Sequence, residues 1–148
     1  MSWVSTTYLE LKDTGFNFLT ATIGMLLVQH GSSLEGEGEP NIATLAAYTL
    51  LNEATFSGYV RKTLAGKAVT RSTTRKRSEI SFNPVNFGNV ASLATPLAGL
   101  LLFNDTGGSD ATRQPLIYSD SVGIFPFSGG EDLIVACLEN GSIVTYGA

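Results

Sequence analysis

The chain has 148 residues and a formal net charge of −4, with 43% hydrophobic and 15% charged residues. A chain of this length folds as one domain with a substantial core, its lone Cys137 excludes an intrachain disulfide, and its longest apolar run, residues 21–28, is far shorter than the roughly 20 residues of a membrane span. Soluble domains usually carry about a quarter charged residues, so the low charged share predicts that part of the surface is buried against other copies.

The N-terminal residues lack the basic region and apolar core of a secretory signal, which predicts a protein made in the cytoplasm. The first dozen residues contain few breakers and little amphipathic pattern. We therefore predict an N-terminal arm over residues 1–15, in which Trp3 and Tyr8 contact a neighbouring molecule, followed by a single domain over residues 16–148.

Short runs rich in Val, Thr, Phe and Tyr alternate with Gly, Asn, Asp and Pro along the rest of the chain, which is typical of all-β proteins. The sequence predicts a β-sandwich or jelly-roll-like domain with at most one short helix, over residues 42–51. An exposed acidic loop is expected at residues 31–40. The predicted strands cover residues 6–11, 22–29, 57–64, 68–74, 79–82, 97–103, 115–118, 123–127, 133–138 and 142–146.

Seven of the nine Lys and Arg residues fall within residues 61–77, a segment that we call the basic strip. Nucleic-acid binding would combine such charges with aromatic side chains that stack on bases. The basic strip contains no aromatic residue, so direct nucleic-acid binding is not expected. The intervening Thr, Ser, Ala and Val suit a hairpin, whose charges either protect a strand edge or contact an acidic partner, including the Glu-rich loop of another copy.

The sequence contains no recognisable catalytic motif and no His/Cys metal-binding motif. The only histidine, His30, precedes a Gly-Ser loop, and no Gly-x-Ser-x-Gly nucleophile motif occurs. Cys137 lies in an apolar strand pattern and is expected to be buried and inert. We expect no enzyme, no cofactor and no His/Cys metal site, whereas cation binding by the oxygen-rich loop 31–40 stays open.

Four segments resemble small virion structural proteins of tailed bacteriophages, a group that includes capsid decoration or cement proteins. Residues 52–64 contain Gly58-Tyr59-Val60-Arg61-Lys62-Thr63-Leu64, which is similar to a Gly-Tyr-x-Arg-x-x-Leu segment of that group. Residues 80–85 resemble its next strand, residues 98–107 its central strand and turn, and residues 115–118 the strand after.

The resemblance implies a β-sandwich or jelly-roll-like subunit that adds to an assembled capsid or tail, with trimers common among decoration proteins. Our leading expectation is a homotrimer that binds the major capsid protein on the exterior of the virion and bridges neighbouring capsomers, without a membrane partner. The alternative is a tail or fibre module that recognises a receptor such as a glycan through Tyr118, Phe125 and Phe127. The predicted interface residues come from the arm, the basic strip and the strand over residues 97–103: Trp3, Tyr8, Arg61, Lys62, Arg71, Arg75, Lys76, Arg77, Leu100 and Leu102.

Overall fold

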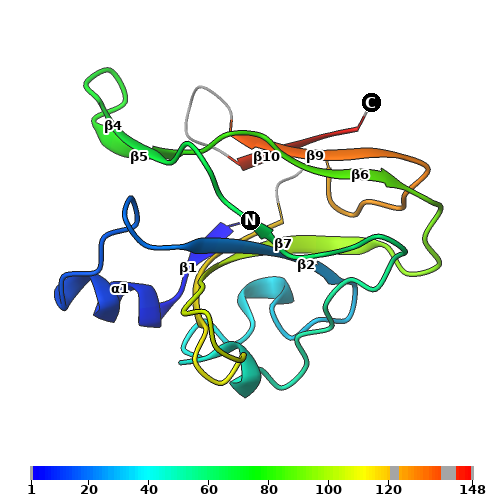
Figure 1. Cartoon of the computed structure of the whole chain (residues 1–148), viewed down its shortest axis with the longest axis horizontal. Helices are drawn as coiled ribbons and strands as arrows, with labels where there is room; N and C mark the ends of the chain where they lie inside the picture. The colour runs from blue at the N-terminus through cyan, green and yellow to red at the C-terminus, as the bar shows by residue number, and fades with distance from the viewer. Residues whose placement is uncertain (1, 121–123, 138–142, 148) are drawn as a thin grey trace.

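The computed structural model of the chain describes residues 2–120, 124–137 and 143–147. It shows an all-β single domain with two facing antiparallel sheets and a separate two-stranded hairpin, which confirms the predicted fold class (Figure 1). One α-helix and ten strands are described: β1 (Ser2–Val4), α1 (Thr6–Asp13), β2 (Ile23–Gln29), β3 (Lys62–Thr63), β4 (Ala68–Ser72), β5 (Arg77–Ser81), β6 (Val85–Val90), β7 (Leu97–Asn104), β8 (Gln114–Ser119), β9 (Glu131–Cys137) and β10 (Ile143–Gly147).

The five-stranded sheet has the order β1-β8-β7-β2-β3, and the three-stranded sheet has the order β10-β9-β6. Successive side chains of a strand point to opposite faces. In β7 the alternation divides Leu100 and Leu102, which face the second sheet, from Leu101 and Phe103, which face away from it. Strands β2 and β7 are nearly devoid of polar side chains because both of their faces are covered.

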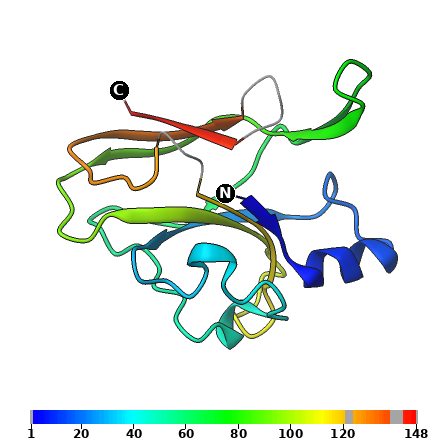
Figure 2. The same ribbon diagram turned by 180° about the vertical axis from the view of Figure 1, so that it is seen from behind.

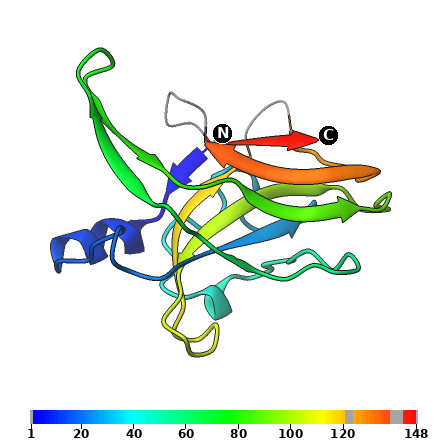
Figure 3. The same cartoon turned by 45° about the horizontal axis from the view of Figure 1, so that its top comes forward.

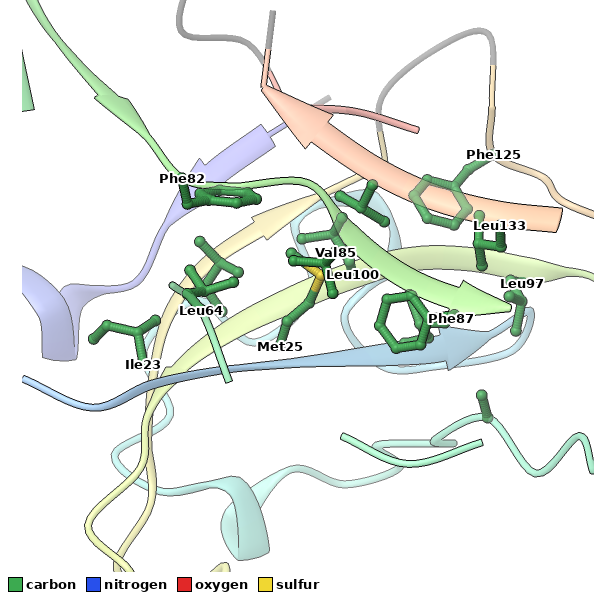
Figure 4. Packing of buried hydrophobic residues seen from close by; sticks show 14 of the residues in the cluster. Ile23, Met25, Leu64, Phe82, Val85, Phe87, Leu97, Leu100, Phe125 and Leu133 are labelled. Atoms are coloured by element: carbon green, nitrogen blue, oxygen red, sulfur yellow. The ribbon is translucent and has the colours of Figure 1, made fainter. Parts of the chain in front are cut away.

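The larger core fills the space between the two sheets. Met25 and Leu100 from the five-stranded sheet pack with Val85, Phe87 and Leu133 from the three-stranded sheet (Figure 4). Residues at both ends of the layer extend this core, among them Leu64 and Phe82 on the two chain segments that lead into the hairpin.

A second core covers the outer face of the five-stranded sheet. The segment over residues 31–51 runs beneath the sheet (Figure 2) and places Leu34, Leu45 and Tyr48 against Leu101 and Phe103. Both faces of β2 and β7 are therefore closed by the protein's own chain.

The N-terminal segment, predicted as an arm, lies on the protein's own five-stranded sheet. Strand β1 pairs with β8, and the strand predicted over residues 6–11 is wrong because these residues form α1. The helix begins after Ser5, whose hydroxyl accepts a hydrogen bond from the backbone N–H of Tyr8 at 3.0 Å and donates one to the carbonyl of Pro115. This cap outweighs the strand preference of Thr6 and Thr7.

The helix predicted over residues 42–51 is also wrong, since only a single 3₁₀ turn forms there, over Leu45–Ala47. The backbone N–H groups of Leu45 and Ala46 donate to the carbonyls of Arg113 and Asp110, at 2.9 and 3.0 Å. Partners on a distant loop thus replace the hydrogen bonds of a helix.

Most other strand predictions are confirmed, within one to a few residues at their ends. The exceptions are residues 57–64, where only the two-residue β3 forms, and residues 123–127, of which the described residues 124–127 contribute an isolated bridge from Phe127 to Leu97. Strand β6 was missed because Gly88, at φ 79°, interrupts its alternating pattern with a bulge.

Candidate functional site

The hairpin β4–β5 projects from one end of the sandwich and pairs only with itself (Figure 3). We call residues 68–81 the hairpin arm. The structure divides the basic strip into two groups. Arg61, Lys62 and Lys67 lie on the body of the protein, whereas Arg71, Arg75, Lys76 and Arg77 lie on the hairpin arm.

Arg61 is the centre of an ion-pair network on the body. Its guanidinium group donates to Glu53 from Nε at 2.8 Å and Nη2 at 2.7 Å, and to Asp110 from Nη1 at 2.6 Å and Nη2 at 2.8 Å. Arg113 continues the network by donating to Asp110 at 3.2 Å and to Asp105 at 2.9 Å. These contacts tie the segment before β3 to the turn between β7 and β8.

The charges in this network shift one another's titration. The hydrogen bond from Arg61 lowers the pKa of Asp110, and the hydrogen bond from Arg113 lowers the pKa of Asp105. The hydrogen bonds to Asp110 and Glu53 in turn raise the pKa of Arg61. The guanidinium group of Arg61 is thus engaged by carboxylates of the same chain and is not free for an interface.

Two further residues of the Gly-Tyr-x-Arg segment are structural as well. Tyr59 accepts a hydrogen bond from the backbone N–H of Leu27 at 3.0 Å and donates one to Glu53 at 2.8 Å, and burial raises its pKa. The ammonium group of Lys62 lies 5.9 Å from the centre of the Phe87 ring. The contacts of residues 59–62 therefore link the edge of the five-stranded sheet to the three-stranded sheet.

The base of the hairpin arm is anchored on both chain segments. Before the arm, the backbone N–H of Leu64 donates to Ile23 at 2.8 Å, and Lys67 donates to the carbonyl of Ala21. After the arm, the backbone N–H of Asn83 donates to Ala65 at 2.9 Å. Beyond these contacts, the residues of β4 and β5 are exposed or only partly buried.

Part of the positive charge of the hairpin arm is offset by a carboxylate on the arm itself. Glu79 accepts hydrogen bonds from Arg75 at 3.1 Å and from Arg77 at 3.0 Å. Partial desolvation acts to raise the pKa of Glu79, but the hydrogen bonds from Arg77 and Arg75 bring it below its ordinary value. Arg75 and Arg77 are therefore partly compensated.

One face of the hairpin arm carries uncompensated charge. Val69 lies opposite Ile80, and Arg71 lies opposite Ser78, so these four residues share a face. Neither Arg71 nor Lys76 forms an ion pair within the described part of the chain. An open concavity of about 490 Å³ lies at the tip, and none of its described lining residues is a carboxylate: Arg71, Ser72, Thr73, Lys76, Arg77 and Ser78.

The predicted interface residues outside the basic strip are buried inside the domain. Leu100 and Leu102 are 0% and 1% exposed between the sheets, Tyr8 packs in the same core, and Trp3 stacks on Tyr118 in the outer core. Their apolar character reflects the protein's own packing. Of the predicted set, only the four residues on the hairpin arm are exposed.

The aromatic side chains of the alternative, receptor-binding prediction are also internal. Tyr118 is 1% exposed, and Phe125 and Phe127 are 8% and 5% exposed. Their rings pack in the two cores and are not exposed to a glycan.

Two of the three carboxylates in the acidic loop, those of Glu35 and Glu39, bind groups of the chain itself. Glu35 accepts hydrogen bonds from the backbone N–H of Gly31 and contacts His30 at 3.0 Å, whereas Glu39 accepts from the backbone N–H and the hydroxyl of Thr49. Within the described residues, no group of three or more His, Cys, Asp or Glu side chains is placed to hold a metal ion.

Burial raises the pKa of the half-buried Cys137 thiol.

None of the described helices has the length and apolar character needed to cross a membrane. No protein-family model matches the chain, and neither a curated protein nor a solved structure is significantly similar to it. Its function is therefore inferred from its own sequence and geometry.

Proposed function

We propose that the protein is a non-enzymatic structural subunit of a bacteriophage virion. In this role it is a capsid decoration, or cement, protein that forms a homotrimer, binds the major capsid protein on the exterior of the assembled capsid and bridges neighbouring capsomers. It is synthesised in the host cytoplasm. The hairpin arm is its intermolecular contact.

The observation that carries this proposal is the hairpin arm, with its uncompensated Arg71 and Lys76. An isolated two-stranded hairpin is marginally stable in water and adds little to the stability of the domain that bears it. A projection of this kind, with charge left unpaired on an otherwise acidic protein, is suited to contact another molecule. The exposed side chain of Val69 on the same face adds apolar area to that contact.

The resemblance to phage virion proteins supports the same proposal. Its leading segment contains Tyr59 and Arg61, which hold the edge of the sandwich together, and its central segment includes Asp105, which belongs to the same ion-pair network. The residues that carry the resemblance therefore stabilise the part of the sandwich from which the hairpin arm projects.

Electron microscopy of particles assembled with and without the protein tests the proposal. We expect additional density at regular positions on the capsid lattice, together with a higher temperature of capsid disruption. Density confined to the tail would contradict the capsid role and would favour the receptor-binding alternative.

A binding experiment addresses the contribution of the hairpin arm. Replacement of Arg71, Arg75, Lys76 and Arg77 by Ser removes its positive charge. We expect capsid occupancy to fall and its dependence on salt to weaken, because contacts between exposed charges are screened by salt. Unchanged occupancy at every salt concentration would remove the hairpin arm from the interface.

A further inference from the structure

The charges of this protein are separated along the molecule. The hairpin arm carries four positive charges and one carboxylate, Glu79, for a net charge of +3, whereas the rest of the chain carries 12 carboxylates and five Lys and Arg residues, for a net charge of −7. Each copy therefore presents both a cationic arm and an anionic body, and two copies are complementary to each other.

The anionic position best placed for such a contact is the start of β9. Glu131 and Asp132 pair with Val90 and Asn89, at the C-terminal end of β6. The hairpin arm leads into the N-terminal end of β6, so the two charged regions lie at opposite ends of the same layer (Figures 1 and 3). Glu131 is exposed, and the one described side-chain partner of Asp132 is the neutral amide of Asn89 at 3.2 Å.

The tip concavity provides groups that bind carboxylates. Its cationic side chains come from Arg71, Lys76 and Arg77, and its hydroxyl groups come from Ser72, Thr73 and Ser78. Arginine binds carboxylates through two parallel hydrogen bonds, and hydroxyl donors complete the remaining acceptor positions.

We propose that the tip of the hairpin arm docks onto a second copy of this chain, at the acidic end formed by Glu131 and Asp132. This inference rests on the proposed role of the hairpin arm as an intermolecular contact. The two surfaces differ, so the contact is head-to-tail, and repetition of such a contact closes a ring when its rotation permits. A closed ring of three copies matches the proposed trimer.

Charge reversal tests the contact in solution, without any capsid. Arg71→Glu/Lys76→Glu reverses the tip, and Glu131→Lys/Asp132→Lys reverses the acidic end. Because like charges facing each other cost several kcal/mol, and 1.4 kcal/mol is a factor of ten in affinity, each double variant should weaken self-association on the order of 100-fold or more. Sedimentation velocity over a range of protein concentrations measures the loss.

The decisive measurement is whether a second charge reversal restores the contact. The quadruple variant, which carries both reversals, again places opposite charges across the interface and should associate at low salt. The matched control, Glu10→Lys/Asp13→Lys, makes the same charge change on the exposed face of α1 and should leave association unchanged. Circular dichroism establishes that each variant is folded, and Glu131→Lys alone replaces the double variant if the latter does not fold.

Wild-type protein that stays monomeric at low salt would overturn the inference. Double variants that associate as the wild type does, or a quadruple variant that fails to recover, would do so as well. These results leave the capsid role standing, because capsid occupancy is measured separately. Loss of occupancy in a hairpin variant that still forms oligomers would instead place the hairpin arm against the capsid.

Discussion

Single side chains hold together segments that are far apart in the sequence. Arg61 binds Glu53 and Asp110, which lies 49 residues away, and its guanidinium group sits 5.4 Å from the centre of the Phe103 ring. Because the planar guanidinium group can serve two carboxylates and an aromatic face at once, no other residue type fits this position equally well.

Arg61→Lys should therefore lower the free energy of unfolding. A lysine keeps the charge but has no fork with which to hold two carboxylates, and hydrogen bonds to charged groups contribute about 1.5–3 kcal/mol each in the favourable case. With side-chain exposure of 24%, we expect a loss of about 1–3 kcal/mol in urea denaturation. Arg75→Lys on the exposed hairpin arm is the control, with an expected change within about 0.5 kcal/mol. Equal effects would contradict the role of Arg61.

Gly24 in β2 is a second residue with a strict requirement. A Cβ atom at this position would lie well inside van der Waals contact with the ring of Phe103. Gly24→Ala should cost about 1–3 kcal/mol of stability because a packed core resists added volume. Phe103→Leu shortens the opposing side chain, so the double variant should be more stable than the sum of the two single effects. Strict additivity would show that the ring is not the obstacle.

Elements whose own hydrophobic pattern determines their structure could be predicted from the sequence. Elements whose structure depends on particular hydrogen-bond partners could not. The apolar run in β7 predicts a strand covered on both faces, as the structure shows. In contrast, the start of α1 depends on a cap, and the conformation of segment 42–51 depends on carbonyl groups of a distant loop that accept hydrogen bonds from its backbone N–H groups. Neither partner can be identified from the local sequence.

The candidate site was predicted in part. The clustering of charge located the hairpin arm. It could not show that Arg61 is ion-paired whereas Arg71 is not, because a partner of Arg61, Asp110, is distant in the sequence. Likewise, Leu100 and Leu102 have the apolar character of interface residues and of core residues alike. Only the position of the second sheet decides between them.

The hairpin arm is an element with little influence on the stability of the domain. Val69 and Ile80 are paired directly across its two strands, so an Asn-Gly turn can replace residues 70–79 between them. We expect this shortened variant to fold and to lose no more than about 1 kcal/mol of stability, because exposed loop tips tolerate such changes. Thermal unfolding followed by circular dichroism measures the effect. A collapse of the near-ultraviolet signal would show that the hairpin arm is needed for packing.

At the scale of the whole molecule, the carboxylates set the dependence of stability on acid. The pKa values of Asp105 and Asp110 are lowered in the folded state from an ordinary value of 3.8. Groups with a depressed folded pKa stabilise the protein fully above the unfolded value, and this stability is lost as the pH falls through the folded pKa. Unfolding in acid should therefore begin below about pH 4 for this network.

Asp110→Asn separates this contribution from the rest. The variant should lose about 1–2 kcal/mol at pH 7, where the ionised carboxylate binds Arg61 and Arg113. It should also show a shallower decline of stability between pH 4 and pH 2, since one titrating group is gone. Urea denaturation at a series of pH values measures both effects, with Asp13→Asn at the exposed end of α1 as the control. A decline as steep as in the wild type would contradict the prediction.

The closure of both faces of the five-stranded sheet has a consequence for the motions of the protein. Strand β7 lies between β2 and β8, with one core above it and another below. Its amide hydrogens can exchange with solvent only when the whole domain opens, whereas those of β4 and β5 are released by fraying of the hairpin arm alone. Hydrogen exchange should therefore find the slowest amides in β7 and fast ones in the hairpin arm, so that the arm can reorder on a partner while the sandwich stays closed.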